Sequence, residues 1–150
     1  MNTLQLFQVD AFASELFAGN PAAVCILEEW LPEATMQAIS AENNLAETAF
    51  AVPVEGGYGI RWFTPETEVA LCGHATLATA FILFRDREST SDSIRFESRE
   101  RGLLEVRRTG DWLVLDFPAD KLERIDIPKG IIDALGTEPL SCFKGETDYM

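Results

Sequence analysis

The chain has 150 residues, 47% of them hydrophobic and 25% charged, a size and composition that suit a soluble folded domain with a real core. Its 12 basic and 25 acidic side chains give a formal net charge of −13, which argues against nucleic acid and anionic membranes as partners because both carry negative charge. The longest nearly apolar stretch, Ala75–Phe84, is only about half of the roughly twenty residues that a bilayer span needs.

The cysteines and the amino terminus bear on the cellular compartment. Cys25, Cys72 and Cys142 are odd in number and widely spaced, which fits neither a disulfide framework nor a zinc motif, so we expect reduced thiols. His74 is the single histidine, and we expect no metal because no carboxylate-rich cluster accompanies it. No basic stretch leads into an apolar run at the start of the chain, so we predict a cytoplasmic location.

The first part of the chain predicts strands around one helix. Strand-like runs cover Leu4–Val9 and Ala22–Leu27, and we expect these two to pair. A proline followed by an acid then predicts a helix over Ala34–Asn43. Thr48–Val54 and Tyr58–Phe63, joined by a glycine turn, have the pattern of a hairpin.

The middle of the chain predicts the architecture. Ala75–Phe84 is apolar on every face apart from two threonines, which is typical of a helix wrapped on all sides. Three short strands follow, at Ser93–Ser98, Leu103–Arg107 and Trp112–Phe117, with turns that predict an antiparallel meander. Six or seven strands with one such helix predict an α+β fold in which a curved, barrel-like antiparallel sheet encloses a central buried helix.

The last part of the chain differs in character. Residues 118–128 are charged and loop-like, Lys129–Leu135 with Gly136 after it predicts a short capped helix, and Pro139–Phe143 could begin a strand. We therefore expect an amino-terminal domain over residues 1–120. Residues 121–150 would be a connector and the start of a second domain whose remainder is missing.

Cys72, Gly73 and His74 stand at the start of the apolar helix and form the first candidate site. Free N–H groups at a helix start could bind a substrate carboxylate, glycine would allow close approach, and the helix field would lower the pKa of Cys72. The alternative is structural: a turn glycine, a small buried cysteine and a capping histidine.

Glu47 is the second candidate, because it lies at a helix-to-strand junction and is followed by apolar residues. Partial burial there would raise its pKa toward the range useful for proton transfer, whereas a solvated loop glutamate is the alternative. The third candidate, Gly19-Asn20-Pro21, could equally be an ordinary turn. The remaining acids near these segments we expect to form a solvated surface: Glu66, Glu68 and Asp86–Glu88.

Taken together, these segments resemble successive motifs of the amino-terminal part of the PhzF-like (phenazine biosynthesis-like) isomerase and epimerase family. The matching stretches are Val9–Phe12, Phe17–Val24, Asn44–Phe50, Arg61–Pro65, Cys72–Thr76 and Leu115–Pro118. The resemblance implies two similar domains, each a barrel-like sheet around a central helix and related in fold to diaminopimelate epimerase, with the active site in the cleft between them. The family's second domain has no counterpart in 150 residues.

The resemblance also implies roles for the candidate residues. Glu47 would shuttle a proton between carbons of the substrate, Gly73 and His74 would hold the substrate, and Gly19 and Asn20 would face the cleft. The implied protein is an isomerase that needs no cofactor, acts on a small carboxylate and forms a homodimer. We expect the Glu47 carboxyl group to face the start of the helix near Gly73.

Two other hypotheses stay open. Cys72 lies where epimerases of the related fold carry one of two catalytic cysteines, so a thiol-dependent epimerase or racemase is the first. The second is a fragment that folds, associates with itself through an exposed apolar cleft and catalyses nothing.

Overall fold

The structure is a computed structural model that describes residues 3–15, 17–117, 119 and 121–145. Pro118, in one of the motifs above, and the chain end at Met150 lie outside the described residues. The chain divides into two compact units, Met1–Phe117 and Pro118–Met150.

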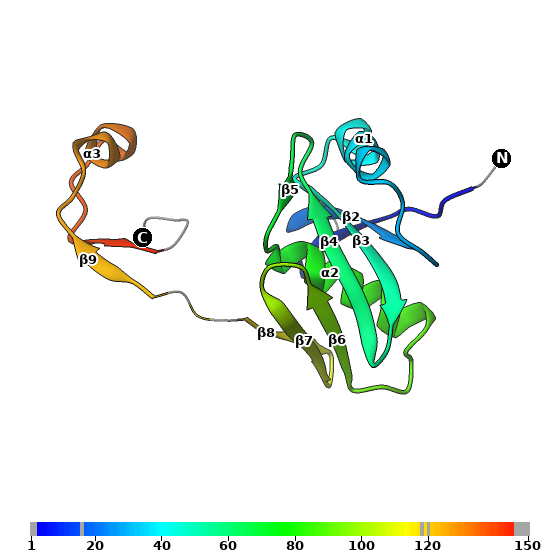
Figure 1. The fold of residues 1–150 in the computed structure, drawn as a ribbon. Helices are drawn as coiled ribbons and strands as arrows, with labels where there is room; N and C mark the ends of the chain where they lie inside the picture. The colour runs from blue at the N-terminus through cyan, green and yellow to red at the C-terminus, as the bar shows by residue number, and fades with distance from the viewer. Residues whose placement is uncertain (1–2, 16, 118, 120, 146–150) are drawn as a thin grey trace. The chain divides into compact units, whose positions relative to one another are not determined.

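The described part of the first unit contains eight strands in one sheet and two helices (Figure 1). The elements in chain order are β1 (Phe7–Ala11), β2 (Asn20–Ile26), α1 (Glu33–Asn43), β3 (Glu47–Val54), β4 (Gly57–Phe63), β5 (Glu68–Val69), α2 (Gly73–Asp86), β6 (Ser93–Ser98), β7 (Gly102–Thr109) and β8 (Trp112–Asp116). Strand order is β1-β2-β3-β4-β6-β7-β8, and β5 pairs with β4.

The α+β class and the curved sheet around a helix are confirmed, with one detail that the sequence did not indicate. Most neighbouring strands are antiparallel, including the expected β1–β2 pair and the β6–β7–β8 meander. Two pairs, β2–β3 and β4–β6, are parallel. Each parallel pair is joined through a helix, which carries the chain back across the sheet before the next strand starts.

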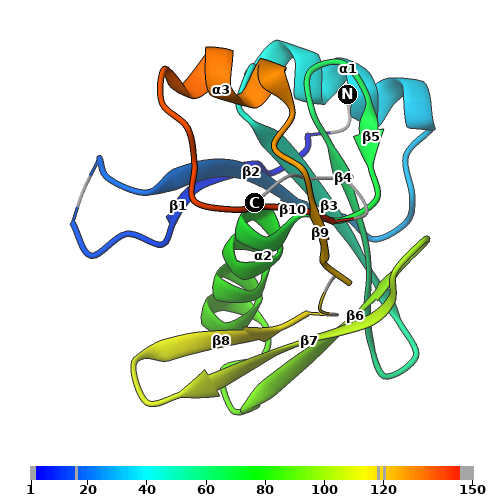
Figure 2. The same ribbon diagram turned by 90° about the vertical axis from the view of Figure 1, so that its left-hand side faces the viewer.

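Helix α2 occupies the concave side of the sheet, between the β1–β2 end and the β7–β8 end (Figure 2). Its two buried threonines are satisfied within the helix, because Thr76 Oγ1 donates to the Cys72 carbonyl at 2.5 Å and Thr79 Oγ1 to the Ala75 carbonyl at 2.7 Å. Phe81 remains exposed, so the enclosure expected on all sides is a half-barrel rather than a closed shell.

The two faces of β3 have different partners. Ala49 and Ala51 belong to the core that contains α2, whereas Phe50 and Val52 pack in a second cluster with Met36 of α1. Side chains alternate between the faces of a strand. Glu47, in step with Ala49 and Ala51, therefore lies on the α2 face.

The second unit contains β9 (Glu123–Ile125), α3 (Lys129–Leu135) and β10 (Cys142–Lys144), with β9 and β10 antiparallel. The helix lies where the sequence predicted it, and the last strand starts at Cys142 rather than Pro139. The division into a domain over 1–120 and the start of a second domain stays a prediction. Among the described residues, no helix has the length and apolar character to cross a membrane.

Candidate active site

Glu47 is held at the start of β3 by the way α1 ends. Asn44 adopts a left-handed conformation and its N–H donates to the Ser40 carbonyl at 3.2 Å, which stops the helix. Asn43 Nδ2 then donates to Thr48 Oγ1 at 3.2 Å across the junction. In the parallel ladder Glu47 is opposite Ala22 of β2, a core residue on the α2 side.

The start of α2 lies opposite this carboxylate. Cys72 is the N-cap residue in extended conformation, and Gly73 and His74 form the first turn. His74 Nε2 lies 3.3 Å from Glu47 Oε2, and His74 Nδ1 lies 3.4 Å from Cys72 Sγ. The structure thus brings Glu47, Cys72 and His74 together, with the imidazole ring in contact with both the carboxylate and the thiol.

Burial within this group is uneven. The His74 side chain is 9% exposed and that of Glu47 is 21% exposed. The contact between His74 Nε2 and Glu47 is close but not aligned as a hydrogen bond, and Nε2 has no hydrogen-bond partner in the part of the chain that the structure describes. The site therefore holds a carboxylate that is partly open to solvent beside a buried polar atom that is unsatisfied.

The expectation that the helix start lowers the pKa of Cys72 is wrong. The pKa of this thiol is raised to about 12, mainly by burial and to a smaller extent by the Glu47 carboxylate. The backbone amides of Ala75 and His74 act in the expected direction, but their effect on the pKa is smaller than that of burial. All three cysteines are free and buried.

The fold requires glycine at position 19 but not at position 73. Gly19 has φ +92°, and an added Cβ would lie 2.4 Å from the Ala11 carbonyl oxygen, so the turn itself requires glycine. Gly73 has no positive φ, and an added Cβ would meet Phe117 Cε2 at 3.4 Å, an ordinary contact. The fold alone does not explain glycine at position 73.

Asn20 opens β2 and is exposed. It pairs with Ala11 of β1 and lies two positions before Ala22, the residue opposite Glu47. Residues two apart on a strand share a face. Asn20 therefore lies on the same face of the sheet as Glu47, just beyond the position where β3 starts.

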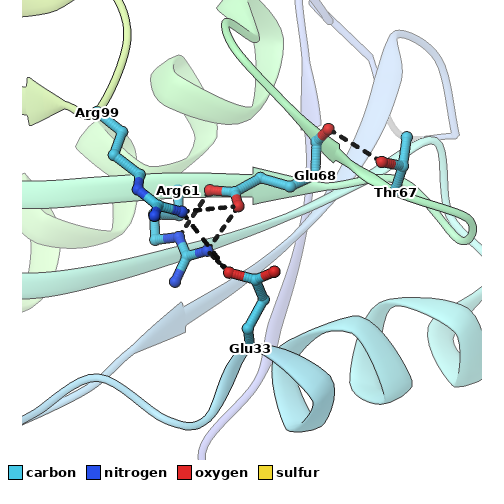
Figure 3. Close-up of polar contacts among 5 residues, drawn as sticks. All are labelled: Glu33, Arg61, Thr67, Glu68 and Arg99. Atoms are coloured by element: carbon cyan, nitrogen blue, oxygen red, sulfur yellow. Dashed lines mark hydrogen bonds and ion pairs between the residues drawn. The ribbon is translucent and has the colours of Figure 1, made fainter.

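A second group of charges, which we call the Arg61 cluster, consists of Glu33, Arg61, Glu68 and Arg99 (Figure 3). Arg61 Nε and Nη2 donate to the two carboxylate oxygens of Glu68 at 2.6 and 2.5 Å, and Nη2 also donates to Glu33 at 2.6 Å. The Arg61 guanidinium lowers the pKa of Glu68, mainly through these hydrogen bonds. Glu68 is therefore not the solvated surface acid that the sequence suggested.

The Arg61 cluster fixes the segment that leads into the candidate site. Arg61 is on β4 and Glu68 is on β5. The bidentate contact between their side chains therefore links the two strands in addition to their backbone pairing. β5 continues through Ala70 and Leu71 into Cys72. The sequence shows Arg61 followed by two acids, Glu66 and Glu68. This pattern alone does not distinguish a paired acid from a solvated one.

The chain is similar in sequence to known proteins. Residues 9–127 match the model of the family described as phenazine biosynthesis-like protein. An uncharacterized isomerase of Pseudomonas aeruginosa is 52% identical over 147 residues, which are 98% of this chain and 56% of that protein. A human phenazine biosynthesis-like domain-containing protein is 45% identical over 123 residues, 77% of this chain and 42% of that protein.

Solved structures agree with this similarity. A phenazine biosynthesis protein of the PhzF family from Enterococcus faecalis is 49% identical and superposes with a TM-score of 0.88. The match covers 97% of this chain and 55% of that chain. The chain thus spans about half the length of the relatives that it matches.

Proposed function

The chain belongs to the phenazine biosynthesis-like family, and from that premise we propose that it is one half of a cofactor-independent isomerase in which Glu47 moves a proton on a small carboxylate-bearing metabolite. The observation that carries the proposal is the placement of the Glu47 carboxylate, 3.3 Å from His74 at the start of α2. A base that acts on a bound substrate must lie within hydrogen-bond reach of the atoms it serves.

The residues around Glu47 suggest how a substrate is held. The first turn of a helix offers unpaired N–H groups and a partial positive charge, which attract a carboxylate. Gly73 leaves the backbone of that turn without a side chain, although the fold would accept a Cβ there. His74, which contacts the Glu47 carboxylate, would keep that carboxylate oriented toward the substrate.

The proposed step conserves atoms and charge. Glu47 as a carboxylate takes a proton from a carbon of the substrate, and the electron pair of that C–H bond remains on the substrate as a delocalised anion. The carboxylic acid formed on Glu47 then gives the proton to a second carbon. The substrate is isomerised, and Glu47 returns to its starting state without an external acceptor.

The parts of the proposal that concern the whole protein follow from the relatives. Because the chain spans about half of their length, a second half would close over the same substrate, and residues 121–150 would begin it. We include a homodimer and a cytoplasmic location in the proposal, the latter supported by three free thiols. The thiol-dependent alternative receives no support, because burial holds the pKa of Cys72 high.

The test replaces Glu47 by Gln in a chain that retains both halves. Transfer of deuterium from solvent into candidate carboxylates, followed by NMR, should slow by about a hundredfold or more, because Gln keeps the shape but cannot accept the proton. The control is Glu55→Gln, an exposed glutamate in the β3–β4 turn, which should leave the rate unchanged. Near-normal turnover by a folded Glu47→Gln variant would disprove the assignment.

A further inference from the structure

Three different metal-binding groups meet at the start of α2. Glu47 offers a carboxylate oxygen, Cys72 a sulfur and His74 an imidazole nitrogen, and these three atoms all lie within 4.8 Å of one another. The sequence concealed this group because Glu47 is on β3, far from the other two along the chain. The expectation of no metal rested on the lack of a carboxylate-rich cluster, and this group is of a different, mixed kind.

An independent observation points to a ligand here. His74 Nε2 is buried, faces Glu47, and lacks a hydrogen-bond partner among the described residues. An unsatisfied polar atom in the interior destabilises the folded chain. Such atoms are uncommon in native structures, and a bound ion is one of the few features that account for them.

The donor set selects the type of ion. Sulfur and imidazole nitrogen together favour Zn²⁺ and similar borderline cations, whereas Mg²⁺ and Ca²⁺ prefer oxygen alone. One carboxylate and one thiolate would neutralise the two charges of the cation, and the thiol proton would pass to solvent. We propose that Glu47, Cys72 and His74 bind Zn²⁺ or a similar divalent cation, with a fourth coordination position left open.

Two of the three donors already have the spacing that tetrahedral zinc requires. Bonds of about 2.0–2.3 Å place neighbouring donor atoms roughly 3.5 Å apart. His74 Nε2 and Glu47 Oε2 are already 3.3 Å apart. The Cys72 sulfur lies 3.4 Å from Nδ1, the other nitrogen of the ring. The Cys72 or His74 side chain must therefore rotate before the sulfur and Nε2 can bind the same cation.

Occupancy by the cation has a consequence for the reaction, which rests on the function proposed above. A Glu47 oxygen bonded to Zn²⁺ is not available to accept a proton. The cation would therefore inhibit isomerisation, and a chelator would restore the activity.

The test measures Zn²⁺ binding to the full chain by competition with a chromophoric chelator. We expect one Zn²⁺ per chain, and we expect Co²⁺ to give a thiolate-to-cobalt charge-transfer band in the near ultraviolet. Cys72→Ser should abolish the band and weaken Zn²⁺ binding by about tenfold or more, and Glu47→Gln should also weaken it. The matched control is Cys25→Ser, a buried cysteine on the other face of the sheet, which should bind as the unmodified chain does.

Lack of the cobalt band in the unmodified chain would overturn the proposal, as would equal Zn²⁺ affinity in the Cys72→Ser and Cys25→Ser variants. Circular dichroism shows whether each variant is folded, and the band in the unmodified chain depends on no variant. Failure of the proposed function would look different. In that case Glu47→Gln would keep its activity without metal, while Zn²⁺ binding would still depend on Cys72.

Discussion

Two groups of polar side chains, the Arg61 cluster and the group at the start of α2, are built in opposite ways. In the Arg61 cluster, opposite charges make aligned hydrogen bonds of 2.5–2.6 Å, so Arg61 and Glu68 satisfy each other. At the start of α2, the Glu47–His74 contact is not aligned, His74 Nε2 has no hydrogen-bond partner among the described residues, and burial disfavours the Cys72 thiolate.

The difference separates a structural role from a functional one. A network in which opposite charges make aligned hydrogen bonds stabilises and rigidifies the fold. A group with unsatisfied atoms lowers stability, and it persists where a ligand or a reaction uses those atoms. Variants that probe stability should therefore affect the first group strongly and the second group weakly.

The largest expected effect on stability comes from Arg61→Ala. The Arg61 side chain is 14% exposed, and its removal leaves the Glu68 carboxylate partly buried without its main partner. We expect the free energy of unfolding to fall by about 2–4 kcal/mol, measured by urea denaturation. Arg61→Lys should recover only part of this loss, because an ammonium group cannot reproduce the bidentate contact.

The matched comparison is His74→Gln at the other group. It removes Nε2, which has no hydrogen-bond partner among the described residues, and the 3.4 Å contact between Nδ1 and Cys72 Sγ. Because hydrogen bonds to sulfur are weak, the free energy of unfolding should fall by no more than about 1 kcal/mol. A loss at His74 equal to that at Arg61 would mean that the two groups do not differ as proposed.

The next largest effect is the loss of the stabilising contribution of Glu68 at low pH. Arg61 holds the pKa of Glu68 below its ordinary value of 4.5. A depressed pKa in the folded state contributes stability above the unfolded pKa, and this contribution is lost as the pH falls through the folded pKa. Glu68→Gln should therefore cost about 1–2 kcal/mol at pH 7, and its difference from the unmodified chain should shrink below about pH 4.

Urea midpoints measured from pH 7 to pH 3 check this prediction. Glu66→Gln is the control, since Glu66 lies two residues before Glu68, in the loop that precedes β5, and its carboxylate makes no contact with Arg61 among those found in the described residues. A constant difference between Glu68→Gln and the unmodified chain over the whole range would contradict the assignment.

The comparison also shows which features the sequence could predict. Periodicity located α2 and most strands, because apolar patterning reports the faces that each element buries. It did not indicate that β2–β3 and β4–β6 are parallel, since strand direction depends on the helices between them. It also could not distinguish Glu68 from Glu66, because only the fold places Arg61 opposite one of them.

The sequence likewise predicted some features of the candidate site and missed others. Glu47 and His74 were each chosen from local context and the family resemblance, and the contact between them follows from β3 lying against the start of α2. The predicted effect on Cys72 had the wrong sign because sequence position indicates a helix start but not the depth of burial, and burial dominates the pKa of this thiol.

The smallest expected effect is at the rim of the Arg61 cluster. The Arg99 side chain is 66% exposed, and its Nη1 lies 3.4 Å from Glu68 and 3.6 Å from Glu33. Arg99→Ala should therefore lower the free energy of unfolding by about 0.5 kcal/mol or less. In 1 M salt this small difference should disappear, because the Debye length falls to about 3 Å. A loss that approaches that of Arg61→Ala would show that the four side chains act as one cooperative network, in which the exposed arginine orients Glu68 for its buried partner.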